Sequence, residues 1–252
     1  MYHYIGLVLF IIYIIYINIY KLNIYKYKQL LSPKELYIQN AGYITKNTYK
    51  GDLFFTDFQI TKKNRVYLLM LNSMYKISQI LNIPFFLSSG TLLGYYREGT
   101  FISYDYDIDI GIYEEDYSSD LIPVMQNNNF IHYRTFSHKG MITELSFYFK
   151  NNIIGRKAKI DIFIHYKNKD DPTKIYWMSE NIHTRRPITY QISRFNIKPT
   201  IFLNQTVWVP VDTKKYLEEH YGPKWHIPIK PAWISKQSNG YRYHSSPYSI
   251  VR

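Results

Sequence analysis

Two segments of this chain alternate between apolar and polar residues with a period of two. The sequence from 107 to 110 is Asp-Ile-Asp-Ile, and the sequence from 159 to 165 is Lys-Ile-Asp-Ile-Phe-Ile-His. A β-strand with this pattern directs its isoleucines to one face and the residues between them to the other. We therefore predict a strand that presents Asp107 and Asp109 together, and a second strand that presents Asp161 on one face.

The residues before the first of these strands predict a strand, a turn and a helix. Residues 84–87 are Pro-Phe-Phe-Leu, which is typical of a short buried strand. Gly90 permits a tight turn, and Ser89 or Thr91 is a suitable cap for a helix that continues through Tyr96. Because free N–H groups at a helix N-terminus attract phosphate, we expect Ser89, Gly90 and Thr91 to bind phosphate.

Helical spacing of apolar residues is clearest between 64 and 80. We predict a helix there that begins at Asn64. The stripe that faces the core is expected to contain Val66, Leu69, Met70, Ser73, Ile77 and Ile80. A second helix is predicted over 213–220, with Asp212 as its N-cap and Gly222 at its end.

Strand patterns return at 130–136 and at 141–150, on either side of His138-Lys139-Gly140. This arrangement predicts a β-hairpin with a turn at these three residues. We expect His138 to be exposed to solvent in that turn.

The N-terminal region is apolar without helical periodicity. The stretch Tyr4–Tyr20 contains 17 residues, no charge and one asparagine. That length is at the short end for a transmembrane helix, and several tyrosines suit the membrane interface. We predict a single-pass membrane anchor at 1–22 and a linker at 23–60. The lysines after the span favour a cytosolic domain by the positive-inside rule.

Composition changes this picture in two ways. The chain has 252 residues and a formal net charge of +12, but it is rich in Ile, Lys, Asn and Tyr throughout, so the charge reflects a general bias rather than a nucleic-acid partner. The tail, 231–252, is polar and basic. There is no cysteine, which excludes disulfides, thiolate zinc sites and a cysteine nucleophile.

Acidic residues are concentrated where the first alternating strand lies. Six of the 19 acidic residues fall between Asp105 and Asp116. Carboxylates two residues apart on a strand are about 6.5–7 Å apart and repel unless a cation lies between them or one is protonated. Mg²⁺ prefers such oxygen ligands and completes its shell with substrate phosphates. A solvent-exposed strand face is the alternative.

Asp161 would lie among core residues on its strand, where a carboxylate is costly unless it is paired or bound to a metal. It is therefore the candidate for a third metal ligand. The alternative is an ion pair with Lys159 or Arg156.

The stretch from Ser88 to Gly111 resembles the signature of the LicD/fukutin family in the nucleotidyltransferase superfamily. The block from 209 to 228 resembles the C-terminal element of the same family. Bacterial members often have Pro-Trp-Asp-Asp-Asp where this chain has Ser-Tyr-Asp-Tyr-Asp at 103–107. The positions in register with the first signature are Ser89, Gly90, Thr91, Leu92, Leu93, Gly94, Arg97, Phe101, Ile102, Asp105, Asp107, Ile108, Asp109, Ile110 and Gly111.

This resemblance implies an α/β (α+β) fold, a nucleotidyltransferase-type mixed sheet flanked by helices, over 61–230. It implies transfer of a phospho-alcohol, ribitol phosphate or phosphocholine, from a CDP-linked donor to a glycan hydroxyl with release of CMP. Mg²⁺ or Mn²⁺ would be held by Asp107, Asp109 and Asp161, which are also the expected catalytic residues. Eukaryotic relatives imply a domain in the lumen of the Golgi or endoplasmic reticulum.

The expected donor contacts are Ser89, Gly90, Thr91, Arg97 and Asp105, with Arg97 neutralising phosphate charge. Three other functions stay open at this point. They are a template-independent nucleotidyltransferase acting on nucleic acid or a small molecule, a glycosyltransferase with an Asp-x-Asp metal site, and an inactive membrane-anchored scaffold.

Overall fold

The computed structural model describes residues 57–150, 158–180, 187–228, 242–243 and 249–251, all of which belong to one compact unit, Lys50–Arg252. The predicted anchor at 1–22 and nearly all of the predicted linker lie outside these residues, as does most of the polar tail. None of the helices in the described ranges is both long and apolar enough to cross a membrane.

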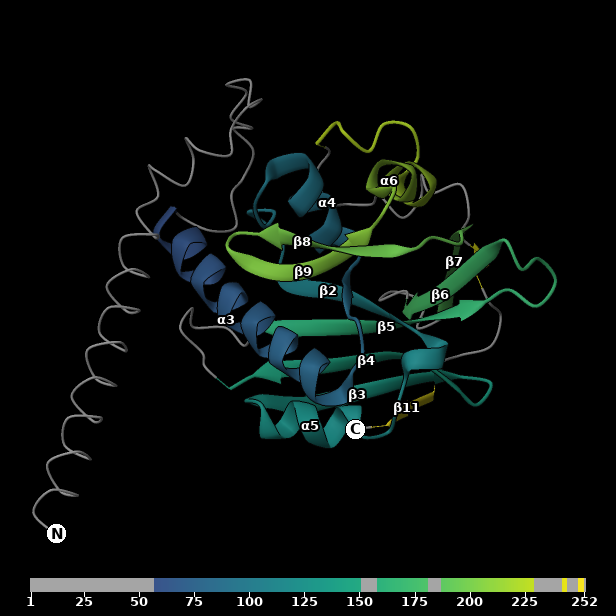
Figure 1. Ribbon diagram of the computed structural model, residues 1–252, viewed down its shortest axis with the longest axis horizontal. Coiled ribbons are helices and arrows are strands. Elements are labelled where there is room, and N and C mark those ends of the chain that lie inside the picture. Colours follow the sequence, from purple (N-terminus) through teal and green to yellow (C-terminus); the bar gives the residue numbers. More distant parts are fainter. Residues whose placement is uncertain (1–56, 151–157, 181–186, 229–241, 244–248, 252) are drawn as a thin grey trace, which may run out of the picture. The chain divides into compact units, whose positions relative to one another are not determined.

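The described residues form one mixed sheet, as the sequence predicts (Figure 1). Its main path runs β10-β7-β6-β5-β2-β1-β9-β8, while β4 joins β5 to β3 and β11 pairs with β3. The strands are β1 (Phe86–Leu87), β2 (Asp107–Tyr113), β3 (Phe130–His138), β4 (Met141–Phe149), β5 (Lys159–Lys167), β6 (Lys174–Glu180), β7 (Pro187–Ser193), β8 (Ile197–Phe202), β9 (Gln205–Pro210), β10 (Arg242–Tyr243) and β11 (Ser249–Val251).

The two strands with alternating patterns lie side by side in this sheet. β2 and β5 are parallel, and their register sets Asp107 beside Lys159 and Asp109 beside Asp161. β5 also pairs with β4 along its first half and with β6 at its end. The isoleucines of both strands are buried in the core, which leaves the acidic residues together on the opposite face.

Within the described ranges, five helical segments accompany the sheet: α3 (Asp57–Leu81), α4 (Ser89–Glu98), η1 (Glu114–Asp116), α5 (Leu121–Asn127) and α6 (Thr213–Tyr221). α3 contacts β9 and α5, and α5 contacts β3. α4 packs against β2 and against α6, so these two helices lie together (Figure 1). Asp212 caps α6 through the Lys215 N–H at 3.0 Å, which confirms the predicted N-cap.

The predicted helix at 64–80 is correct in type but wrong in its start and in part of its stripe. α3 begins at Asp57, so Asn64 lies inside the helix and does not cap it. Leu69 and Ile80 are 39% and 61% exposed, whereas Tyr67 is buried with Leu71 and Met74. Which helix residues are buried depends on where the sheet packs against the helix, and the sequence alone does not show where that sheet lies.

The predicted hairpin is confirmed as β3 and β4, but the prediction for His138 is wrong. Its side chain is 3% exposed. Lys139 and Gly140 alone form the turn, with φ values of 50° and 80°, as in a two-residue hairpin loop. His138 therefore belongs to β3 and pairs with Met141.

Candidate active site

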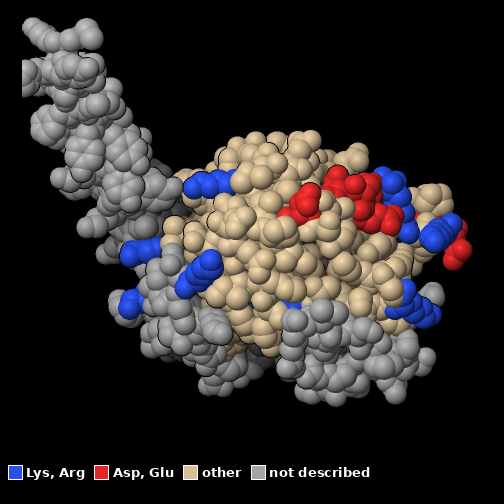
Figure 2. All heavy atoms as spheres, turned by 90° about the horizontal axis from the view of Figure 1, so that it is seen from below, with Lys and Arg blue, Asp and Glu red and all other residues tan. Residues whose placement is uncertain are grey.

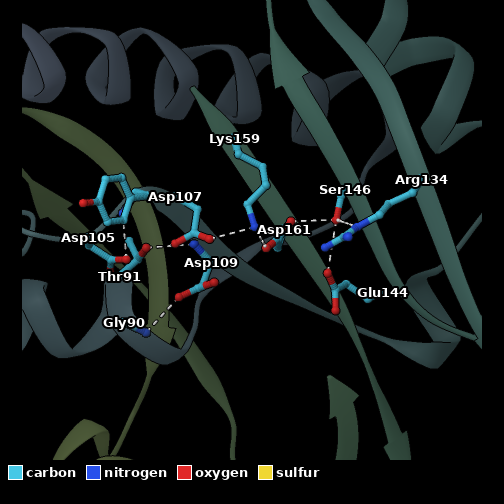
Figure 3. A network of polar contacts seen from close by, with 11 residues as sticks. Gly90, Thr91, Asp105, Asp107, Asp109, Arg134, Glu144, Ser146, Lys159 and Asp161 are labelled. Atoms are coloured by element: carbon cyan, nitrogen blue, oxygen red, sulfur yellow. Dashed lines mark hydrogen bonds and ion pairs between the residues drawn. The ribbon is translucent and has the colours of Figure 1, made fainter. Parts of the chain in front are cut away.

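Three carboxylates meet at the start of β2. Asp107 and Asp109 project from β2 on the same face, and Asp105 comes from the loop just before it (Figure 3). Each offers an oxygen atom, and these atoms all lie within 4.8 Å of one another. We call these three residues the acidic triad. The sequence predicted the first two as metal ligands and Asp105 as a donor contact, whereas the structure brings all three together.

α4 holds the triad through two hydrogen bonds to β2. The Gly90 N–H donates to Asp109 Oδ2 at 2.9 Å, and the Asp109 N–H donates to Thr91 Oγ1 at 2.8 Å. A Cβ on Gly90 would lie 2.6 Å from Asp105 Oδ2 and 3.1 Å from Asp109 Oδ2. Only glycine at this position lets both carboxylates approach the backbone this closely. The phosphate contacts predicted for Gly90 and Thr91 stay predictions, since both groups bind Asp109 in this structure.

The N-cap of α4 is Ser88, not Ser89 or Thr91, and its side chain makes no capping bond. The Ser88 hydroxyl instead lies 2.9 Å from the hydroxyl of Tyr216, which is on α6. Ser89 follows with a positive φ of 41°. The two blocks that the sequence analysis singled out are thus joined by a direct contact between buried side chains.

Lys63 on α3 fixes the loop that carries Asp105. Its buried Nζ donates to the main-chain oxygens of Ile102, Ser103 and Asp105 at 2.6, 2.9 and 3.2 Å. Burial lowers the pKa of Lys63 to about 8, although the negative charge of Asp105 acts to raise it. The loop carbonyls and the nearby carboxylates thus compensate for burying the ammonium group.

The triad is strongly coupled electrostatically. Burial, followed by the charge of Asp107, raises the pKa of both Asp105 and Asp109 well above the usual range. Burial also acts to raise the pKa of Asp107, but the charge of Lys159 holds it below its usual value. Asp105 and Asp107 share a hydrogen bond, so without a cation this pair must hold a proton.

The residues present fit a hard divalent cation. All three triad ligands are carboxylates, the donors that Mg²⁺ and Mn²⁺ prefer. Nearby, the Tyr67 hydroxyl is buried with no hydrogen-bond partner among the described residues. Burial and the charges of Asp107, Asp105 and Asp109 raise its pKa, which places this hydroxyl in the field of the triad. A cation with its bound water would satisfy both the excess negative charge and this unpaired group.

Asp161 lies beside Asp109 in the β2–β5 register, as expected for a third carboxylate, but its oxygens are engaged elsewhere. Oδ2 accepts from Lys159 Nζ at 2.7 Å, and Oδ1 accepts from the Ser146 hydroxyl at 2.7 Å. Lys159 Nζ also lies 2.9 Å from Asp107 Oδ2. The ion pair that the sequence left as an alternative for Asp161 is therefore present.

A polar row continues from Asp161 across β4 to β3 (Figure 3). Ser146 Oγ lies 3.1 Å from Glu144 Oε1, and Arg134 Nε lies 3.5 Å from Ser146 Oγ. Glu144 is 4% exposed. Burial, followed by the charge of Asp161, raises its pKa to about 8. Glu144 is therefore neutral at pH 7, when it can donate to Ser146 while Ser146 donates to Asp161.

Arg97 is not brought to the triad. It lies in the last turn of α4, about 10 Å along the helix axis from Gly90. Its guanidinium pairs with Glu98 at 2.5 Å and donates to the Trp225 main-chain oxygen at 3.4 Å. It also hydrogen-bonds to Tyr104. The predicted contact between Arg97 and phosphate stays a prediction.

Comparison with known proteins places this chain in a family. The family model for the LicD/FKTN/FKRP nucleotidyltransferase domain matches residues 82–212, more than half of the chain. This chain belongs to the LicD/FKTN/FKRP family. The match includes the triad, α4 and the polar row, and it ends at the N-cap of α6.

Three animal relatives show the extent of the similarity. The human ribitol-5-phosphate transferase FKTN is 35% identical over 158 residues, 63% of this chain and 32% of that protein. The mouse protein of the same name is 35% identical over 182 residues, 72% and 37% respectively. An uncharacterized protein of Caenorhabditis elegans is 27% identical over 161 residues, 61% and 41%. The matches span about a third to two fifths of the length of these relatives.

Several residues that build this LicD-family site were missed at the sequence level, although three of them left a signal. Lys63 stands three and seven residues before Val66 and Met70, on the buried side of an apolar stripe. Glu144 and Ser146 lie on either side of Leu145 in a strand that is otherwise mostly apolar. Polar residues at core positions indicate a paired or functional group. The role of Tyr216 had no local signal.

One face of this LicD-family domain can be compared with the basic surface that a nucleic-acid track requires. On the face in Figure 2, the Lys and Arg side chains of the described residues stand in separate places. They do not form a continuous band, and acidic side chains gather on the same face. Nucleic-acid channels usually present a continuous basic groove along the phosphate backbone.

Proposed function

We propose that this protein transfers a phospho-alcohol, of the ribitol phosphate or phosphocholine type, from a CDP-linked donor to a glycan hydroxyl and releases CMP. The observation that carries this proposal is the acidic triad, held against the N-terminus of α4 by Gly90 and Thr91. The family assignment and the name of the FKTN relatives support the choice of ribitol phosphate.

In the proposed reaction, the acceptor oxygen bonds to the phosphorus that carries the alcohol. The bond between that phosphorus and the oxygen bridging it to CMP breaks, so CMP leaves with the bridging oxygen. The proton of the acceptor hydroxyl passes to a base in the site. A bound Mg²⁺ or Mn²⁺ supplies charge neutralisation at the diphosphate.

We assign the cation to Asp105, Asp107 and Asp109, because their oxygens are the ones that converge. Gly90 and Thr91 hold Asp109 in place, and Lys63 holds the loop of Asp105. Asp161 was expected to bind the metal and to act as a catalytic residue. We now propose that Asp161 holds Lys159 in place, since both oxygens of Asp161 accept hydrogen bonds from protein groups.

The test is CMP release by the full chain, with and without Mn²⁺, from CDP-ribitol, CDP-choline and CDP-glycerol in the presence of a mixed glycan acceptor. We expect Mn²⁺-dependent CMP release that falls at least 100-fold in Asp109→Asn. Asp120→Asn is the matched control, because Asp120 is exposed and caps α5 without a side-chain hydrogen bond.

A folded chain that binds Mn²⁺ but releases no CMP from any of the three donors would contradict the proposal. Consumption of nucleoside triphosphates instead would favour a nucleotidyltransferase. Equal turnover by Asp109→Asn and the unaltered chain would remove the triad from the mechanism.

We further propose that residues 4–20 anchor the protein in a membrane with the catalytic domain in the lumen of the Golgi or endoplasmic reticulum. The support is the uncharged apolar stretch and the resemblance to eukaryotic family members. The sequence has one Asn-x-Ser/Thr motif, Asn204-Gln205-Thr206, and the exposed Asn204 lies in the turn between β8 and β9.

Asn204 can therefore report the side of the membrane, because N-glycans are added in the lumen. In a eukaryotic cell we expect the protein to stay with the membrane pellet in alkaline carbonate. We also expect a glycosidase-sensitive mass shift that is lost in Asn204→Gln. Extraction by carbonate would contradict the anchor, and an unglycosylated membrane protein would indicate a cytosolic domain.

A further inference from the structure

Lys159 lies between carboxylates of two neighbouring strands. Its Nζ is 2.9 Å from Asp107 Oδ2 on β2 and 2.7 Å from Asp161 Oδ2 on its own strand, β5 (Figure 3). Its side chain is 23% exposed. An ammonium group has three N–H donors, so these two contacts leave one donor for a further acceptor. The charged nitrogen thus stands at the edge of the acidic triad with a donor to spare.

Asp161 is held by protein groups on both of its oxygens. The Ser146 hydroxyl and the Lys159 ammonium each donate at 2.7 Å, and the Asp161 side chain is only 7% exposed. The convergent oxygens that a cation requires come from the triad and do not include Asp161. A carboxylate in these surroundings is suited to fixing a lysine rather than to binding a metal.

Enzymes that transfer phosphoryl groups often place two cations about 3.5–4 Å apart, each contacting the reacting phosphate. Asp107 and Asp161 are the neighbouring carboxylates that could hold a second cation here, and the Lys159 ammonium contacts both of them. Lysine is a compact point charge that binds phosphate well. The Lys159 ammonium contacts one carboxylate on each of the two strands, and opposite charges at such distances favour its charged form.

We propose that Lys159 is the fixed second cation of this site, so that the protein binds one divalent cation at the triad and contacts the donor phosphate through the Lys159 ammonium. The inference rests on the proposed function, which it deepens by assigning the phosphate contact. Asp161 is then a positioning residue that acts through Lys159, and Ser146 keeps Asp161 in place.

The first test measures Mn²⁺ binding to the full chain without donor, by titration calorimetry and electron paramagnetic resonance. We expect one Mn²⁺ per chain. Asp109→Asn should weaken binding at least tenfold, whereas Asp161→Asn should change it by less than about threefold. Two Mn²⁺ in the unaltered chain, or equal losses in the two variants, would overturn the inference.

The second test replaces Lys159 with methionine, which keeps the length of the side chain without its charge. We expect Lys159→Met to bind a second Mn²⁺, because Asp107 and Asp161 lose their cation, and this second ion should be absent in Lys159→Met/Asp161→Asn. CDP affinity is then measured at an Mn²⁺ concentration that saturates the triad. It should be at least tenfold weaker in the double variant than in the unaltered chain, and Lys159→Arg should bind CDP more tightly than the double variant does. Lys167→Met is the matched control, since Lys167 pairs with Glu115 at the far end of β5.

Unchanged Mn²⁺ stoichiometry together with unchanged CDP affinity in the Lys159 variants would reduce Lys159 to a structural ion pair and overturn the inference. If Mn²⁺ and CDP bind as expected but no CDP-linked donor is turned over, the proposed function is refuted and the assignment of Lys159 as the second cation still holds. If the unaltered chain bound no Mn²⁺, both would fail. Asp161→Asn retains a neutral side chain of the same shape, so the first test stands even if the Lys159 variants fold poorly.

Discussion

The hydroxyl groups of Ser88 and Tyr216 lie 2.9 Å apart although the residues are 128 positions apart in the sequence. Ser88 is the N-cap of α4, and Tyr216 lies in the middle of α6. Both side chains are buried, so this contact joins the helix that holds the triad to the C-terminal block. The Tyr216 hydroxyl also hydrogen-bonds to the backbone at Ser89.

Removing this contact should destabilise the fold without changing the chemistry of the triad. Tyr216→Phe leaves the buried Ser88 hydroxyl without this partner, so we expect a loss of about 1–3 kcal/mol in the free energy of unfolding. Urea denaturation of Tyr216→Phe, Ser88→Ala and the double variant measures the coupling. Strictly additive losses would show that the two hydroxyls do not interact.

Gly90→Ala should impair metal binding more than folding. The new Cβ would lie 2.6 Å from Asp105 Oδ2, and this carboxylate is a side-chain end that can move away. We expect at least a tenfold weaker Mn²⁺ affinity by titration calorimetry with a folded protein. Gly99→Ala is the control. It has open space but a φ of 66°, so it should cost about 1 kcal/mol of stability and leave Mn²⁺ affinity unchanged.

Lys63 should control the position of Asp105 from a distant helix. Lys63→Met removes the donor to three main-chain oxygens of the loop, so we expect a loss of about 3–5 kcal/mol in stability and a weaker Mn²⁺ affinity. Arg65→Met on the exposed side of α3 is the control. Thermal unfolding and Mn²⁺ titration of both variants provide the comparison, and equal behaviour of the two would contradict this role for Lys63.

Glu144 should make the metal-free protein less stable as the pH rises. Its pKa is raised from 4.5 to about 8 in the folded state. The folded state therefore binds more protons than the unfolded state between these values, so the stabilisation present below pH 4.5 disappears as the pH rises through 8. One full proton corresponds to about 1.4 kcal/mol per pH unit.

Urea unfolding at several pH values between 5 and 8, in the presence of a chelator, measures this slope. Glu144→Gln is neutral at every pH, so its slope should be shallower than that of the unaltered chain. The raised pKa values of Asp105 and Asp109 act in the same direction as that of Glu144. Burial lowers the pKa values of His165 and His220 to about 3, so these two groups oppose the slope below pH 6.5 in both proteins. Identical slopes in the two proteins would show that Glu144 does not titrate in this range.

Much of the acidic site was predictable because its signal is local. Period-two alternation determined that Asp107 and Asp109 share a strand face, and turn and capping residues determined the placement of α6 between Asp212 and Gly222. These features depend on backbone geometry within a few residues, which the sequence carries directly. That Asp161 shares a site with the aspartates of β2 was expected from the family resemblance, and Asp161 does pair with Asp109 in the sheet.

The partners of each carboxylate were decided only by the tertiary structure. The β2–β5 register delivered Lys159 to Asp107, while β4 brought Ser146 to Asp161. Lys63 reaches Asp105 from a helix about forty residues earlier, and Arg97 is bound at the far end of α4. The sequence by itself determined which residues are acidic and which face they share. The pairing of those charges depends on distances of a few ångströms between separate strands and helices, which only the folded chain sets.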